Sequence, residues 1–283
     1  MAGIGDNTSK VTKYDNPNRT LTDPYEGQQL GEIWGYVVDG YFKTDEEARN
    51  YKVDQSFVNQ MINASALDNG LHAGDLKFVD LDGNNKIEQT TSANDRKDMK
   101  VIGNSLPRYN YNFGISADWY GIDFSVLFQG IGKQNWYPGA ETSMFWGPYS
   151  RPYASFIPSD FMSQVWSEEN TNAYFPRPRG YVALGSNREL AVVNTKYLQN
   201  LAYCRLKNLS IGYTLPDKWL SKIGFEKIRV YFSGENLLTF TKLHSDYIDP
   251  EQASASNSWK TSKSDANIYP WAKTYSFGVD ITF

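Results

Sequence analysis

The sequence lacks several features that define common soluble folds and helical membrane proteins. It has one cysteine, Cys204, in 283 residues, which excludes an internal disulfide framework and a metal site built from several cysteines. No run of apolar residues is longer than four, so no segment can cross a bilayer as a helix. Basic residues number 28 against 32 acidic ones and form no cluster, which argues against nucleic-acid binding.

The sequence also lacks a catalytic arrangement. Its two histidines, His72 and His244, lie in expected loops with no nucleophile at a meaningful spacing, and there is no glycine-rich phosphate loop. We therefore expect no enzymatic activity. Residues 1–7 have neither the charged start nor the apolar core of a signal peptide. The protein is expected either to remain in the cell or to be a piece of a longer exported protein.

The most regular feature of the sequence is an alternation of apolar and polar residues with a period of two. Within 274–283 the odd positions are aromatic or β-branched, and the even positions are polar or glycine. The same alternation runs through 109–119 and 122–129. Successive side chains of a β-strand point to opposite faces, so such segments predict strands with one apolar and one polar face. Strands are expected near 31–42, 107–119, 121–131, 203–215, 227–241 and 271–283, after a polar lead-in loop at 1–29 that follows a truncated strand.

The connections between these strands differ in length in a regular way. Long stretches lie at 43–106, 132–202 and 244–270, whereas the connections at 120–121 and 216–226 are short. Compact soluble domains rarely hold loops of such length, but outer-membrane barrels have short turns at one end and long loops at the other. The low mean hydropathy of -0.56 is compatible with this, because a barrel strand needs only every second residue to be apolar. We predict an all-β fold, in which residues 30–283 form about six antiparallel strands of a large transmembrane β-barrel with long extracellular loops. The alternative is a soluble, secreted β-sandwich that binds carbohydrate without transporting it.

Six stretches, in this order, resemble the C-terminal part of SusC/RagA-type TonB-linked outer-membrane transporters. They are GEIWGYVVDGYF (31–42), GDLKFVDLDGNNKI (74–87), VIGNSLPRYNYNFGISADWYGIDFSVLFQG (101–130), RLKNLSIGYTLP (205–216), KIRVYFSGENLLTFTK (227–242) and YSFGVDITF (275–283).

The resemblance implies a protein of the outer membrane of a Gram-negative bacterium. It implies a barrel of about 22 strands, plugged by an N-terminal domain, with a SusD-like surface lipoprotein as a lid. Energy would come from TonB through contacts made by the plug. The plug and most strands are absent from these 283 residues, so the sequence is interpreted as a fragment of a nutrient importer. The expected cargo is an oligosaccharide, with an oligopeptide as the second choice.

The segment that begins at Asp80 resembles the start of a calcium-binding loop. Asp80, Asp82 and Asn84 would offer side-chain oxygens at positions 1, 3 and 5, and Lys86 its main-chain carbonyl at position 7. Asn85 replaces the usual glycine and tolerates a left-handed conformation. Position 12 is Thr91 rather than glutamate, and Asp95 is a candidate for the missing carboxylate. The alternative is an ordinary Asp/Asn/Gly turn without a metal.

Aromatic residues crowd the long stretch after residue 131. Trp136, Tyr137, Trp146 and Tyr149 are candidates to stack on a sugar ring or to contact the lid. Alternatively, they pack together and hold the long loop in place. On the polar face of the expected strands, Arg229 and Glu235 are expected to form a pair inside the barrel or to contact the plug.

Overall fold

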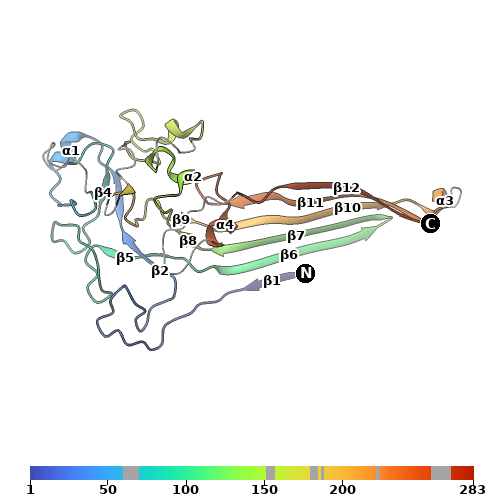
Figure 1. The fold of residues 1–283 in the computed structure, drawn as a ribbon, viewed down its shortest axis with the longest axis horizontal. Coiled ribbons are helices and arrows are strands. Elements are labelled where there is room, and N and C mark those ends of the chain that lie inside the picture. Colours follow the sequence, from blue (N-terminus) through green and yellow to red (C-terminus); the bar gives the residue numbers. More distant parts are fainter. Residues whose placement is uncertain (60–69, 151–156, 179–183, 186–187, 221–223, 256–268) are drawn as a thin grey trace.

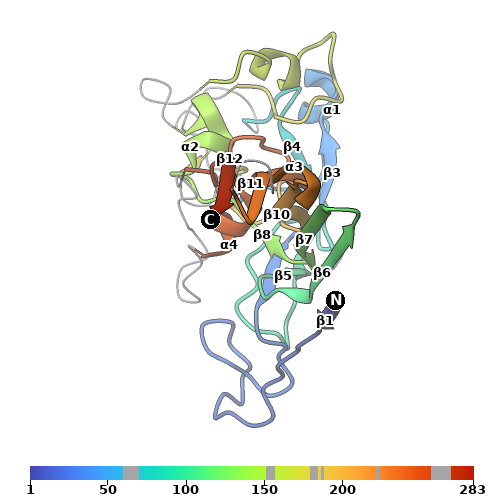
Figure 2. The same cartoon turned by 90° about the vertical axis from the view of Figure 1, so that its right-hand side faces the viewer.

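The protein is described by a computed structural model that covers residues 1–59, 70–150, 157–178, 184–185, 188–220, 224–255 and 269–283. Its main element is a six-stranded antiparallel sheet with the order β1-β6-β7-β10-β11-β12. The strands are β1 (Ala2–Gly5), β6 (Arg108–Trp119), β7 (Ile122–Lys133), β10 (Tyr203–Thr214), β11 (Lys227–Thr241) and β12 (Thr274–Thr282). Figure 1 shows them extending along the molecule, with most other elements gathered at one end; Figure 2 looks roughly along the strands. Within the covered residues β1 and β12 each pair with one strand, so the sheet does not close.

The two faces of this sheet differ in chemistry, as the alternation predicts. The register aligns side chains of one kind across five strands. One row consists of Ala117, Phe124, Ile211, Phe232 and Phe277, and the row beside it consists of Ser116, Ser125, Ser210, Ser233 and Ser276. We call the side that bears the first row the apolar face and the side that bears the serines the polar face.

A two-residue turn sets the register between β6 and β7. Tyr120 and Gly121 both have positive φ, 47° and 84°, as a type I′ turn requires. This turn matches the twist of the flanking strands, and it places Trp119 opposite Ile122. A shift by one residue would move every side chain of a strand to the other face, so this turn fixes which residues form each face.

The expected barrel strand at 31–42 is wrong. These residues form β2 (Glu32–Tyr36) and β3 (Val38–Tyr41), which pair with β5 (Met99–Asn104) and β4 (Leu76–Phe78) in two separate sheets. The segment lacks a strict period of two, and it buries Tyr36 and Tyr41 in the core of the loop region. The large sheet takes its remaining strand from β1, which lies inside the lead-in that the sequence predicts to be a loop.

The loop region at the end of the sheet has its own aromatic core. The short elements outside the sheets already described are these: β8 (Asn135–Trp136) pairs with β9 (Gln199–Asn200), and the helices are α1 (Asp45–Arg49), α2 (Ser143–Trp146), α3 (Asp217–Leu220) and α4 (Pro250–Ala255), with 3₁₀ turns at Gly147–Tyr149 and Phe161–Gln164. Of these, α3 lies at the opposite end of the strands (Figure 1). Thr44 caps α1 by accepting a hydrogen bond from the N–H of Glu47. In the covered part of the chain, no helix has the length and apolarity needed to span a bilayer.

In the part of the chain that the structure describes, no segment covers the apolar face of the large sheet. Phe277, Ile115 and Val279 are 82%, 63% and 58% exposed. A β-sandwich would place a second sheet over this face, but the other sheets among the covered residues have two strands each and lie in the loop region. The open apolar face therefore agrees with a barrel wall in contact with lipid.

The alternation of faces predicts the accessibility of single cysteines in the full-length, membrane-assembled protein. Phe277→Cys and Val279→Cys should react with a lipid-soluble maleimide, whereas Ser276→Cys and Asp280→Cys should react with a charged, water-soluble one. The labelling ratio at neighbouring positions is the measurement. Reversed or equal labelling along β12 would remove the membrane interpretation and favour the soluble sandwich.

Candidate functional site

The acidic loop after β4 is organised by its own side chains. Asp80 accepts hydrogen bonds from the main-chain N–H groups of Gly83 and Asn85, both at 2.7 Å. Asp82 accepts from the N–H of Asn84 at 3.1 Å. Asn85 has a φ of 64°, so the left-handed conformation expected at this position is confirmed. The loop is therefore a tight turn that holds its carboxylates close together.

A third carboxylate, Asp98, joins the two that the sequence predicts. One oxygen each of Asp80, Asp82 and Asp98 lies within 4.8 Å of the others. Asp98 is fully buried and accepts from the N–H groups of Glu88 at 2.7 Å and Leu81 at 2.9 Å. Asp98 lies 18 residues after Asp80, beyond the 12 positions of a calcium loop, and Asp95 rather than Asp98 is the sequence-based candidate for the missing carboxylate.

The surroundings of Asp98 and Asp80 shift the pKa values of these two carboxyl groups in opposite directions. Burial, together with the charges of Asp82 and Asp80, raises the pKa of Asp98. At Asp80, desolvation favours a higher pKa, but the N–H groups of Asn85 and Gly83 outweigh it, and the pKa is lowered. A cation between these groups would offset the repulsion from Asp82 and Asp80, which adds to the effect of burial on the pKa of Asp98.

The other two expected ligands have protein partners of their own. The side-chain oxygen of Asn84 accepts from the N–H of Lys86 at 2.7 Å, and its amide nitrogen donates to Asp82 at 3.2 Å. The ammonium group of Lys86 lies 3.7 Å from Glu88. The expected role of Lys86 involves its main-chain carbonyl and stays a prediction.

The four aromatic candidates all lie in the core of the loop region. Trp136, Tyr137, Trp146 and Tyr149 are at most 5% exposed. Their polar atoms bond to the main chain: Trp146 donates to Gly139 at 2.9 Å, and the hydroxyls of Tyr137 and Tyr149 donate to Leu190 and Pro176 at 2.8 and 2.5 Å. This burial agrees with the alternative that these rings pack together and hold the loop in place. It gives no support to their expected role in binding a ligand.

A group of charges on the polar face links three strands, β7, β11 and β12, and passes across β10. Arg229 of β11 donates to both carboxylate oxygens of Asp123 on β7, at 2.8 and 2.6 Å, and to Asp280 of β12 at 3.2 Å. The expected pairing of Arg229 with Glu235 is therefore wrong, because Asp123 and Asp280 lie closer along the register. Gly212 of β10 makes the link possible. A Cβ atom there would lie 2.4 Å from Asp123 Oδ1 and 2.6 Å from Arg229 Nε.

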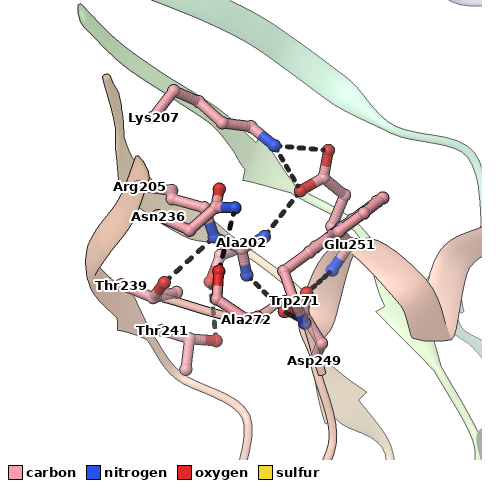
Figure 3. Close-up of polar contacts among 10 residues, drawn as sticks. All are labelled: Ala202, Arg205, Lys207, Asn236, Thr239, Thr241, Asp249, Glu251, Trp271 and Ala272. Carbon is pink, nitrogen blue, oxygen red and sulfur yellow. Dashed lines mark hydrogen bonds and ion pairs between the residues drawn. The ribbon is translucent and has the colours of Figure 1, made fainter. Parts of the chain in front are cut away.

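A second charged group fastens the last long connection to the sheet at the loop end (Figure 3). Arg205 of β10, only 2% exposed, donates to Asp249 at 2.6 Å, to Glu251 at 2.7 Å and to the hydroxyl of Thr239 at 3.0 Å. Lys207 donates to Glu251 at 3.0 Å. We call Arg205, Lys207, Asp249 and Glu251 the clamp. It fixes the start of α4 against the sheet.

Sequence analysis missed the clamp, although one signal was present. Arg205 and Lys207 are the only charged residues of β10, and both occupy odd-numbered positions, as does Tyr203. Their partners lie 44 and 46 residues further on, across a connection whose path no local pattern specifies. A tertiary contact of this kind is not encoded in spacing.

No family model matches this chain. The chain is similar to three curated proteins of Formosa agariphila. TonB-dependent receptor P3 is 29% identical over 264 residues, which make up 91% of this chain and 22% of that protein. TonB-dependent receptor P39 is 26% identical over 283 aligned positions, or 91% of this chain and 25% of that protein. TonB-dependent receptor P26 is 26% identical and covers 78% of this chain and 21% of its own length.

Solved structures show the same fold. The RagAB peptide transporter matches with a TM-score of 0.60 at 18% identity, and the RagAB peptide importer in its open-open state with 0.58 at 19%. Each match covers all of this chain and 26% of the other. The resemblance to SusC/RagA-type TonB-linked transporters is therefore confirmed. The chain spans about a quarter of the length of the proteins it matches.

The clamp predicts unequal effects of removing its two cations. Arg205→Ala should cost about 3–5 kcal/mol of local stability, because it leaves Asp249 buried without a cation. Lys207→Ala should cost less than about 1 kcal/mol, because Lys207 is partly exposed and Glu251 keeps its bond to Arg205. The measurement is the rate of limited proteolysis within 243–273 in the assembled full-length protein. Equal cleavage rates in the two variants would contradict the assigned roles.

Proposed function

We propose that this chain forms part of the wall and external loops of a TonB-dependent outer-membrane importer for oligosaccharides, with oligopeptides as the second choice of cargo. The observation that carries the proposal is the division of the large sheet into an open apolar face and a polar face that bears buried and paired charges. A barrel wall between lipid and a water-filled lumen has this division. The polar face would then line the lumen.

The position of the loop region supports an external role for it. The strand connections at the opposite end are short, as at Tyr120–Gly121, whereas the aromatic core and its long connections lie together at one end (Figure 1). Barrels of the outer membrane have their long loops outside the cell. We propose that this end meets a SusD-like surface lipoprotein, and that TonB acts through a plug formed by residues that these 283 do not include.

Carbohydrate remains the first proposed cargo, as the sequence analysis has it. The structural neighbours are peptide importers, but their identity to this chain is at most 21%. Cargo choice depends on individual side chains in the lumen, which such distant proteins need not share.

The proposal predicts energy-dependent uptake by the full-length protein in its outer membrane. Cells that carry the gene should accumulate fluorescently labelled neutral oligosaccharides. Deletion of the gene, or a protonophore that removes the energy for TonB, should abolish accumulation. Labelled oligopeptides offered in the same assay decide between the two cargo classes. Accumulation that persists without the gene would contradict the proposal.

We also propose that the acidic loop binds calcium in this external region. Three carboxylates within 4.8 Å repel one another, and an ion held by Asp80, Asp82 and Asp98 would remove that repulsion. The affinity should be weak, with a dissociation constant on the order of 10⁻⁴ to 10⁻³ M, because the loop has no bidentate glutamate at position 12. Each carboxylate already accepts main-chain hydrogen bonds, so the turn can also form without metal.

Calcium should protect residues 80–95 of the assembled transporter from proteolysis at millimolar concentration. Asp80→Ala together with Asp82→Ala should abolish the protection, and Asp98→Asn should weaken it. Asp95→Asn is the matched control and should leave it intact. If calcium changes nothing in the unmodified protein, the segment is an ordinary turn.

A further inference from the structure

The bulge in β10 places both cations of the clamp on the polar face. Arg205 lies in register with Gln129 of β7 and Thr239 of β11, and the register shifts between Leu206 and Asn208. Lys207 is the extra residue at this shift, and its ammonium group reaches the same Glu251 as Arg205. Bulges commonly re-aim a side chain in this way. Residues that the clamp holds are therefore held over the polar face.

The clamp also fixes Trp271, which lies just before β12. The main-chain N–H of Trp271 donates to Asp249 at 3.3 Å, and Lys207 Nζ lies 5.6 Å from the centre of its ring. The next residue, Ala272, accepts a hydrogen bond from the side chain of Asn236 at 3.3 Å. Figure 3 shows these contacts converging around the clamp. The indole is held from its main chain, from its ring and from its neighbour.

Trp271 remains accessible although it is held so firmly. Its exposed fraction is 51%, in contrast to the buried Trp136 and Trp146. The other strongly exposed tryptophans of the covered residues are Trp119 at the β6–β7 turn and Trp219 on α3, both at the opposite end of the strands. Trp271 is therefore the accessible, positioned indole at the loop end of the polar face.

The surroundings of Trp271 are polar. On the same face Asn208 lies opposite Glu235, which in turn lies opposite Thr274, and both Asn208 and Glu235 are exposed. An immobilised flat apolar ring on a residue that contacts the polar groups of Asp249 and Lys207 suits a ligand that has an apolar ring face and polar edges. A pyranose unit has this form, and a ring that is already fixed loses little conformational entropy on binding.

We propose that Trp271 is a carbohydrate-stacking residue on the lumenal wall, held in position by the clamp, and that it contacts neutral oligosaccharide cargo near the external mouth. The inference rests on the proposed import function. A sugar ring would have access to Trp271, whereas the four aromatic candidates from the sequence analysis are buried.

The test uses the purified full-length transporter in detergent and measures binding of cellohexaose, maltohexaose, xylohexaose and a neutral hexapeptide by isothermal titration calorimetry. For whichever saccharide the unmodified protein binds, Trp271→Ala should weaken the affinity by about tenfold or more. Trp271→Phe should weaken it by about threefold or less, because the smaller ring keeps part of the stacking contact. Trp219→Ala is the matched control and should change nothing. Limited proteolysis within 243–273 should be the same in all variants, which separates ligand contact from support of the loop.

The outcomes distinguish this inference from the import function. Saccharide binding that is unchanged in Trp271→Ala overturns the inference and leaves import standing. Binding of the hexapeptide but of none of the saccharides also overturns it, and assigns the transporter to peptides. If the unmodified protein binds neither class, the proposed import function fails as well.

Discussion

The register of the large sheet is the constraint on which the rest of the structure depends. Side chains alternate with a period of two, so one shift of register would move the serines to the apolar face and the phenylalanines to the polar face. The turn at Tyr120–Gly121 fixes one end of this register, and the pairing of β7, β10, β11 and β12 carries it across the sheet. The link from Asp123 through Arg229 to Asp280 exists only in this register, because it joins residues of three strands. The clamp depends on the register as well, because the register places Arg205 on the polar face.

The loop region solves a different problem. Long connections cost conformational entropy and expose main-chain polar groups, and they need a core of their own to stay ordered. Here the aromatic rings supply that core, and their hydroxyl and indole N–H groups satisfy main-chain carbonyls inside it. The many aromatic residues thus have two uses. Those on the apolar face of the sheet are exposed or half-buried, and those in the loop region pack together in its core. Sequence composition alone does not separate the two uses.

Alternation predicted the strands that it governs and failed elsewhere for physical reasons. The ranges expected for β6, β7, β10, β11 and β12 overlap the strands of the sheet because each has one exposed apolar face. Residues 31–42 were placed in the sheet on aromatic and β-branched content, but a strand buried within a loop core has the same content. Ala2–Gly5 is too short and too poor in large side chains to show a period. Asp98 and the partners of Arg205 come from distant parts of the chain, so spacing gives no sign of them.

The link from Asp123 through Arg229 to Asp280 has a mechanical consequence. It runs across the strands rather than along them, and it joins β7 to β11 over Gly212 before it reaches β12. Sliding β7, β11 or β12 past its neighbours would have to separate charged groups as well as the main-chain ladder. A pulling force on one of these three strands is therefore shared by the other two, which stiffens the wall against shear at this level.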